Sequence, residues 1–185
     1  MSSYGMVHLI TAFMAIAAGA VVLRPPKGTR WHRTFGHLYA MSMLGVITTS
    51  FAIYGLTGSP GPFHFAAVVA AVALGGGMIT VLFRRPRKGW IEAHAIWMSW
   101  SYIGLMAAFA AESLTRFVMP RAASYLESSD LWTAFWIAVG VASFLVIGVG
   151  WWITKTILPG VIERTPHAMR EERRSLREAE ADPTG

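Results

Sequence analysis

Residues Phe63–Phe83 read FHFAAVVAAVALGGGMITVLF, and this run contains no Asp, Glu, Lys or Arg. An α-helix needs about 20 such apolar residues to cross the hydrocarbon core of a bilayer. The run stops at Arg84-Arg85-Pro86-Arg87-Lys88-Gly89, a basic segment with the Pro and Gly that interrupt helices. The sequence therefore predicts a transmembrane helix at Phe63–Phe83.

Other apolar runs of similar length lie on either side of this one. The five predicted spans are Tyr4–Leu23, Trp31–Leu56, Phe63–Phe83, Ile91–Val118 and Leu131–Leu158. Pro and Gly mark the breaks, as in Gly58-Ser59-Pro60-Gly61-Pro62 after the second span and Met119-Pro120-Arg121 after the fourth. We expect an all-α, polytopic membrane protein whose five transmembrane helices include a four-helix histidine-bearing bundle. Residues 1–158 would form the bundle and residues 159–185 a charged cytosolic tail.

The composition agrees with this fold class. The chain has 185 residues, 14% charged residues and a mean hydropathy of +0.46, which is typical of one membrane bundle. It has no cysteine, which excludes disulfides, thiolate metal sites, iron–sulfur clusters and covalently attached c-type haem. The net charge of +6 comes from basic residues that flank apolar spans, so we expect no nucleic-acid partner.

The distribution of basic residues predicts the orientation. They gather in the tail and in the loops after the first and third spans. The loop residues are Arg24, Lys27, Arg30, Arg33, Arg84, Arg85, Arg87 and Lys88. The positive-inside rule then places the N-terminus outside and the C-terminus in the cytoplasm. We expect no cleaved signal peptide, because the first apolar run lacks a basic n-region and is too long.

Five of the six histidines lie near the ends of predicted spans. They are His8, His32, His37, His64 and His94. An ionisable side chain at membrane depth is costly and therefore marks a candidate functional site. With the predicted topology, His8 and His64 share an outer layer, whereas His32 and His94 share an inner layer. Each of these pairs would join two different helices.

Two imidazoles from different helices are the axial ligands that a low-spin b-type haem needs. They fill both axial positions, which favours electron transfer over oxygen binding. We therefore predict two b-type haems per chain, one held by His8 and His64 and the other by His32 and His94. From the helical rise of ~1.5 Å per residue, the layers would be about 20 Å apart.

Nearby side chains are candidates for a supporting role. Arg30 and Arg33 adjoin the inner layer and Arg116 lies near the outer layer, so each is a candidate partner of a haem propionate. His37 follows His32 by about 140° of helical rotation, so the two would not readily share one iron. We interpret His37 as a neighbour of the ligand or a propionate partner. The alternative is that His37, rather than His32, is the inner ligand.

Glu112 and Arg116 are four residues apart in the outer half of the fourth span. A carboxylate at that depth needs a partner, and a residue one helical turn away can supply it. Two interpretations follow, a structural ion pair and a proton or substrate site.

Three segments carry a resemblance to a known family. They are Pro26–Tyr39 (PKGTRWHRTFGHLY), Gly61-Pro62-Phe63-His64 and Glu92-Ala93-His94-Ala95-Ile96-Trp97-Met98. Over roughly Val7–Arg116 the chain resembles the bacterial membrane family of domain of unknown function 2306, which implies a bacterial inner (cytoplasmic) membrane protein and supplies no activity.

The resemblance carries over to the four histidines of the two layers, His8, His32, His64 and His94. The chain departs from the family pattern at His37, where the family usually has arginine, and this favours His32 as the inner ligand. The two-layer layout also looks like that of cytochrome b561-type diheme proteins, as an analogy of architecture only.

Two alternatives to haem remain. The first is a zinc or copper protein with a hydrolase or transport role. A zinc site would need three or four converging ligands, and the His-x-x-x-His spacing that places two ligands on one helix does not occur in the sequence. The ten methionines suit Cu(I) but are scattered like gap-filling core residues. The second is a scaffold or transporter with interfacial histidines. In a transporter, however, we would expect polar residues at the middle of the membrane-spanning helices.

If the haem prediction holds, a quinol or another small redox molecule would exchange one electron at the outer layer, and the inner layer would equilibrate with it. Such a protein could be a haem-dependent membrane oxidoreductase, and the sequence identifies no catalytic residue. The fifth span could mediate homo-oligomerisation through Gly140, Gly148 and Gly150.

Overall fold

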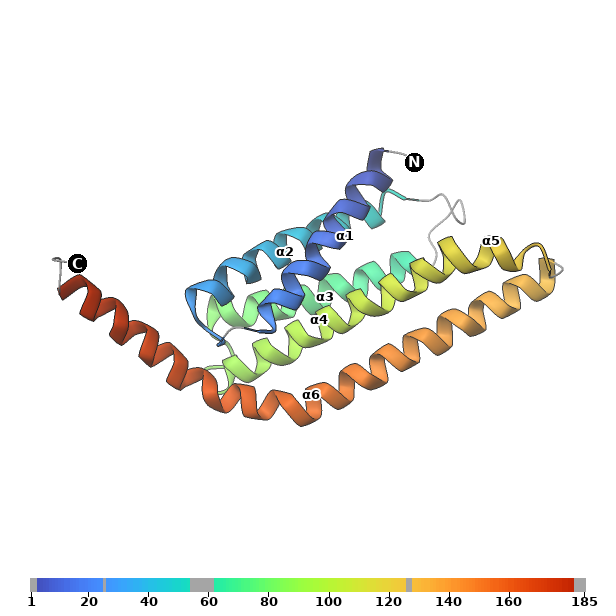
Figure 1. Ribbon diagram of the computed structural model, residues 1–185. Helices are drawn as coiled ribbons and strands as arrows, with labels where there is room; N and C mark the ends of the chain where they lie inside the picture. Colours follow the sequence, from blue (N-terminus) through green and yellow to red (C-terminus); the bar gives the residue numbers. More distant parts are fainter. Residues whose placement is uncertain (1–2, 25, 54–61, 126–127, 182–185) are drawn as a thin grey trace.

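The computed structural model describes residues 3–24, 26–53, 62–125 and 128–181, and the regular structure within them is helical. The helices are α1 (Ser3–Val22), α2 (Arg30–Ser50), α3 (Pro62–Phe83), α4 (Trp90–Ser113), α5 (Met119–Ala122) and α6 (Ser128–Ala181) (Figure 1). A π-helical turn, Leu114–Val118, joins α4 to α5. The all-α fold class predicted from the sequence is confirmed for the described residues.

Two antiparallel helical pairs make up the bundle. α1 packs along α2, and α3 packs along α4, while α6 lies against α4 (Figure 1). Contacts between the two pairs, from α2 to α3 and from α1 to α4, are less extensive than the contacts within each pair. The bundle therefore has a seam where the α1–α2 pair meets the α3–α4 pair.

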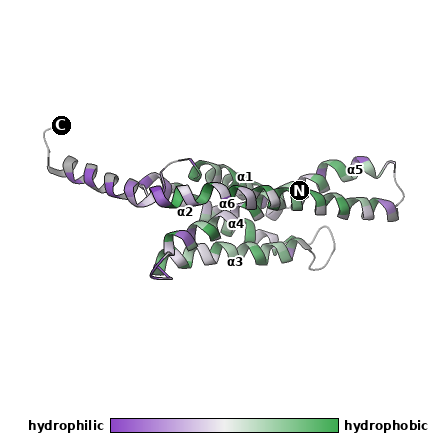
Figure 2. Ribbon diagram, turned by 90° about the horizontal axis from the view of Figure 1, so that it is seen from below, coloured by the Kyte–Doolittle hydropathy of each residue, from purple (hydrophilic) through white to green (hydrophobic). Residues whose placement is uncertain are grey.

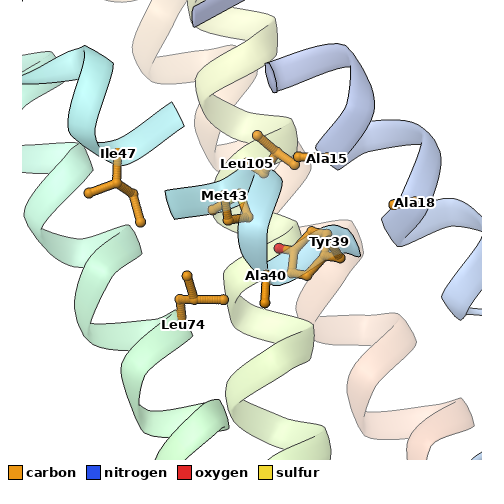
Figure 3. Packing of buried hydrophobic residues seen from close by; sticks show 8 residues of the cluster. All are labelled: Ala15, Ala18, Tyr39, Ala40, Met43, Ile47, Leu74 and Leu105. Atoms are coloured by element: carbon orange, nitrogen blue, oxygen red, sulfur yellow. The ribbon is translucent and has the colours of Figure 1, made fainter. Parts of the chain in front are cut away.

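Buried side chains from all four bundle helices hold the seam closed at its middle. The cluster consists of Ala15, Ala18, Tyr39, Ala40, Met43, Ile47, Leu74 and Leu105 (Figure 3). Beside it, a Cβ on Gly19 would collide with the Tyr102 ring, so the glycine makes room for that ring. The Tyr102 hydroxyl donates to the Ile16 carbonyl at 3.3 Å and ties α4 to α1.

The turn between α1 and α2 places the first histidine of α2. Gly28 has a φ of 84°, which favours glycine, and the Thr29 hydroxyl accepts from the backbone N–H of His32 at 3.4 Å. The Lys27 ammonium donates to the Val22 carbonyl at 2.7 Å and so satisfies the end of α1. Partial burial lowers the pKa of Lys27.

Four stretches of the described residues are long and apolar enough to cross a membrane. They are Ser3–Val22, Phe63–Phe83, Trp90–Ala122 and Thr133–His167, and they match four of the five predicted spans. α2 forms a helix where the second span is predicted, but its polar first turn and its Ser and Thr residues lower its hydropathy. That α2 crosses the membrane therefore stays a prediction. Leu56 and the predicted break at Gly58–Gly61 lie outside the described residues.

The helix at the fourth predicted span continues beyond Val118, where the span is expected to end. Met119-Pro120-Arg121 does not stop the helix, because the π-helical turn and α5 carry it to Ala122. Pro120 lacks the N–H that an α-helical turn would use, and a widened turn directly before it accommodates that loss.

The fifth predicted span is also part of a longer helix. α6 continues past Leu158 and through Pro159 and Pro166 to Ala181, and it changes direction in this second half (Figure 1). Hydrophilic residues dominate its C-terminal part (Figure 2). The expected boundary between bundle and tail therefore lies inside one helix, because the Glu, Arg and Ala residues of the tail favour helix.

Candidate functional site

At one end of the bundle, His8 of α1 contacts two other helices. Its side chain is 13% exposed. Nδ1 lies 2.9 Å from Oγ1 of Thr49 on α2, and Nε2 lies 3.7 Å from Oε2 of Glu112 on α4. Both ring nitrogens of His8 therefore face polar atoms of the bundle.

Glu112 is shared between His8 and Arg116. The guanidinium of Arg116 donates to Oε1 of Glu112 from Nε at 2.9 Å and from Nη2 at 2.6 Å. The structure thus brings together the pair that the spacing of four residues predicts. We call His8, Thr49, Glu112 and Arg116 the outer cluster, after the predicted topology.

His64 lies at the same end of the bundle, in the first turn of α3. Its ring is half-buried and its centroid lies 6.3 Å from that of Phe51, which directly follows α2. Thr49, the partner of His8, belongs to the last turn of α2. The two histidines predicted for the outer layer therefore both border the end of α2.

At the opposite end, His94 of α4 is fixed by α3. Its Nδ1 lies 2.8 Å from the carbonyl oxygen of Gly77. A carbonyl only accepts, so Nδ1 carries the proton, and Nε2 of the neutral ring keeps a lone pair. Histidines that bind metals usually donate their other N–H in this way, which holds the ring in place. Nε2 is therefore the ring nitrogen of His94 that is available to coordinate a metal.

His32 lies near His94 but belongs to the other helical pair. It is half-buried in the first turn of α2, at the same end of the bundle as His94. Its Nδ1 is buried and has no hydrogen-bond partner among the residues that the structure describes. A buried polar atom without a partner is costly, so this nitrogen is suited to bind a further group.

The other predicted residues of the inner end lie on the surface of α2. His37, Arg30 and Arg33 are exposed, whereas His32 is half-buried. This arrangement favours His32 over His37 as the inner ligand. Arg30 and Arg33 flank the inner pair from outside, where they remain candidate propionate partners.

A hydrogen bond that the sequence does not reveal lies between the two layers. The Tyr39 hydroxyl and the Ser101 hydroxyl are buried and 2.9 Å apart, and they connect α2 to α4. Tyr39 follows His32 by seven residues, as Ser101 follows His94, and this spacing is the signal that could have indicated it. Along α4, His94 and Glu112 are separated by about 27 Å at ~1.5 Å per residue, more than the predicted 20 Å.

The donor set of the inner end fits a b-type haem. It offers one imidazole with an oriented Nε2, His94, and one with a buried nitrogen lacking a partner, His32. In the part of the chain that the structure describes, no three His, Cys, Asp or Glu side chains gather closely enough to hold a metal ion. A zinc site of three or four protein ligands is therefore not present in that part.

A cavity of about 150 Å³ lies where the π-helical turn and α5 face α6. Its lining is apolar and consists of Leu114, Val118, Met119, Ala122, Leu131, Ala134, Phe135 and Ala138. None of the histidines lines it. A group held by both His32 of α2 and His94 of α4 would instead bridge the two helical pairs.

Comparison with known proteins gives one match. A family described as "Predicted membrane protein (DUF2306)" matches residues 5–153. No curated protein and no solved structure matches the chain. The matched residues include both histidine layers and the Glu112–Arg116 pair. They exclude the charged end of α6.

Proposed function

The chain belongs to the membrane protein family of domain of unknown function 2306, and we propose that it transfers electrons in the membrane through b-type haem. His32 and His94 would hold one haem, and His8 and His64 a second. The inner pair carries the proposal. One of its imidazoles is oriented by the Gly77 carbonyl, the other has a buried nitrogen without a partner, and they come from different helical pairs.

The residues of the inner end would bind and orient the cofactor. A bound b haem with two imidazole ligands supplies a reversible one-electron carrier with no open coordination position. His94 presents Nε2 from α4, and His32 approaches from α2 across the seam. Arg30 and Arg33 would neutralise the propionates at the surface.

A quinol or another small redox molecule is the exchange partner that we propose for the outer end. Phe117 and Val118 of the π-helical turn are exposed, so a molecule dissolved in the bilayer has access there. The outer cluster adds hydrogen-bonding groups, and the Arg116 side chain is 48% exposed. We propose the bacterial inner membrane as the location, with the N-terminus outside.

A visible spectrum of the purified full-length protein tests the haem proposal. We expect a sharp Soret band, with α and β bands after reduction by dithionite, because both axial positions are filled. His94→Ala should remove one haem per chain, since it deletes the oriented ligand. His37→Ala should keep both, because His37 is exposed.

A colourless protein from cells supplied with haem would contradict the proposal. Zinc and copper analysis of the same sample would then test the non-haem metal alternative. Equal haem loss in both histidine variants would also contradict the assignment of the inner pair.

A further inference from the structure

The hydrogen bond between Tyr39 and Ser101 joins two helices whose backbones stay apart. α2 and α4 lie diagonally across the bundle, and within their described residues no Cα atom of one helix lies within 8 Å of a Cα atom of the other. The Tyr39 side chain crosses this gap, and its hydroxyl lies 2.9 Å from that of Ser101. We propose that Tyr39 and Ser101 are positioning residues, which hold His32 opposite His94. The inference rests on the proposed function, in which these two histidines bind haem.

The register of α2 and α4 carries the inference. Both helices begin at the end of the bundle that has the α1–α2 and α3–α4 turns, so they run in the same direction (Figure 1). Tyr39 follows His32 by seven residues, and Ser101 follows His94 by seven. Seven residues are nearly two full turns and about 10 Å of rise. Because the two hydroxyls meet, the two histidines lie at a similar height on the facing sides of α2 and α4.

The gap between the two backbones is what a site with two imidazole ligands needs. A haem with its two axial rings has to fit between the helices that carry its ligands, so these helices cannot pack backbone to backbone. The backbones of α2 and α4 are separated, and a long side chain bridges them about two turns beyond the histidines. Tyr39 and Ser101 are 3% and 1% exposed, so water does not compete for their hydrogen bond.

The α4 side of the site has a second anchor, which is α3. A Cβ on Gly77 would collide with the Met98 side chain, so this glycine lets α4 approach the α3 backbone. Met98 follows His94 by about one turn, and the Gly77 carbonyl accepts from Nδ1 of His94 at 2.8 Å. The position of His94 therefore depends on α3. We expect loss of the hydrogen bond across the gap to displace His32 instead.

A distance measurement between two spin labels tests the positioning without haem. The chain has no cysteine, so Thr34→Cys and Glu92→Cys accept one label each in the full-length protein in detergent. Both positions are exposed and lie two residues from the histidines. We expect a narrow distance distribution, and a broader one when Tyr39→Phe or Ser101→Ala is added. The two substitutions together should broaden it no further than one alone, because both remove the same hydrogen bond.

Tyr102→Phe is the matched control. It also removes a phenol hydroxyl from a hydrogen bond between helices, but that bond joins α4 to the Ile16 carbonyl of α1. Tyr39→Phe keeps the ring that packs against Tyr102, with the two centroids 6.2 Å apart. We therefore expect the label distances to be unchanged in Tyr102→Phe. Equal broadening in Tyr39→Phe and Tyr102→Phe would overturn the inference.

Haem titration in a His64→Ala background gives the second measurement, because only the inner pair is then complete. Tyr39→Phe should weaken haem binding about two- to tenfold, which is the range that one buried hydrogen bond accounts for. It should also produce a high-spin fraction in the visible spectrum, because His94 keeps the iron while His32 is displaced. Tyr102→Phe should change neither the affinity nor the spin state.

The two measurements separate this inference from the proposed function. Unchanged label distances in Tyr39→Phe and Ser101→Ala would overturn the positioning role whether or not haem binds. A broader distribution with unchanged haem affinity and spin state would overturn it as well. A broader distribution in a protein that binds no haem would support the positioning and overturn the proposed function. Ser101→Ala, on the opposite helix, replaces Tyr39→Phe if that variant does not fold.

Discussion

Glu112 shows how a single charge is accommodated at membrane depth. Its Oε1 accepts both hydrogen bonds of Arg116, and the two side chains are only partly exposed. Arg116→Ala would leave a half-buried carboxylate without its main cation. We expect a loss of roughly 1–2 kcal/mol in the free energy of unfolding, reduced from the fully buried case by solvent screening. Denaturant titration in detergent micelles measures it.

The double variant Glu112→Gln/Arg116→Ala is the control for this prediction. Because the unpaired charge causes the loss, removing it as well should restore at least half of the lost stability. A double variant that is less stable than Arg116→Ala would show that the carboxylate stabilises the bundle through His8 or through another contact.

The residue-level predictions succeed where the spacing is local. Four residues along one helix are enough to pair Glu112 with Arg116, and positions near span ends are enough to place the histidines at the two ends of the bundle, whereas their membrane depth stays a prediction. The hydrogen-bond partners of His8 and His94, which are Thr49 and Gly77, could not be predicted, because they lie on neighbouring helices. Helices that are apolar on all sides carry no stripe that identifies their inward face.

At the level of elements, the contact between α1 and α2 depends on one glycine. A Cβ at position 45 meets Thr11, whereas a Cβ at Gly36 of the same helix meets nothing within 4 Å. Alanine is the better helix former by about 1 kcal/mol, but overpacking costs roughly 1–3 kcal/mol. We therefore expect Gly45→Ala to be destabilised and Gly36→Ala to be neutral or stabilised in thermal unfolding. Equal effects of the two substitutions would contradict this packing.

Helix ends are the elements for which the sequence is least informative. Pro120 predicts a break at Met119-Pro120-Arg121, and the fifth span is expected to end at Leu158, but at both places the helix continues. Proline removes one hydrogen bond and bends a helix, but neighbouring turns can absorb the change by widening. Four of the five predicted spans match helices that are long and apolar enough to cross a membrane, because long apolar runs have few alternative structures in a bilayer.

For the whole molecule, the decisive question is whether α2 crosses the membrane. α2 packs along α1, and the turns α1–α2 and α3–α4 lie at the same end of the bundle (Figure 1). With the N-terminus outside and five crossings, Arg87 is cytoplasmic, whereas Ser3 and Tyr125 are outside. If α2 does not cross, Arg87 is instead outside and Tyr125 is cytoplasmic. The two histidines of each layer would then no longer lie at the same depth in the membrane.

The absence of cysteine makes this arrangement directly measurable, because a single introduced thiol is the only one in the chain. We expect a membrane-impermeant maleimide to label Ser3→Cys and Tyr125→Cys in spheroplasts, and to label Arg87→Cys only after lysis. Labelling of Arg87→Cys in spheroplasts, with Ser3→Cys also labelled and Tyr125→Cys protected, would show that α2 stays on one side. Protection of Ser3→Cys together with labelling of Arg87→Cys would instead invert the orientation. The positive-inside rule disfavours both outcomes, since each would place the basic α3–α4 turn outside.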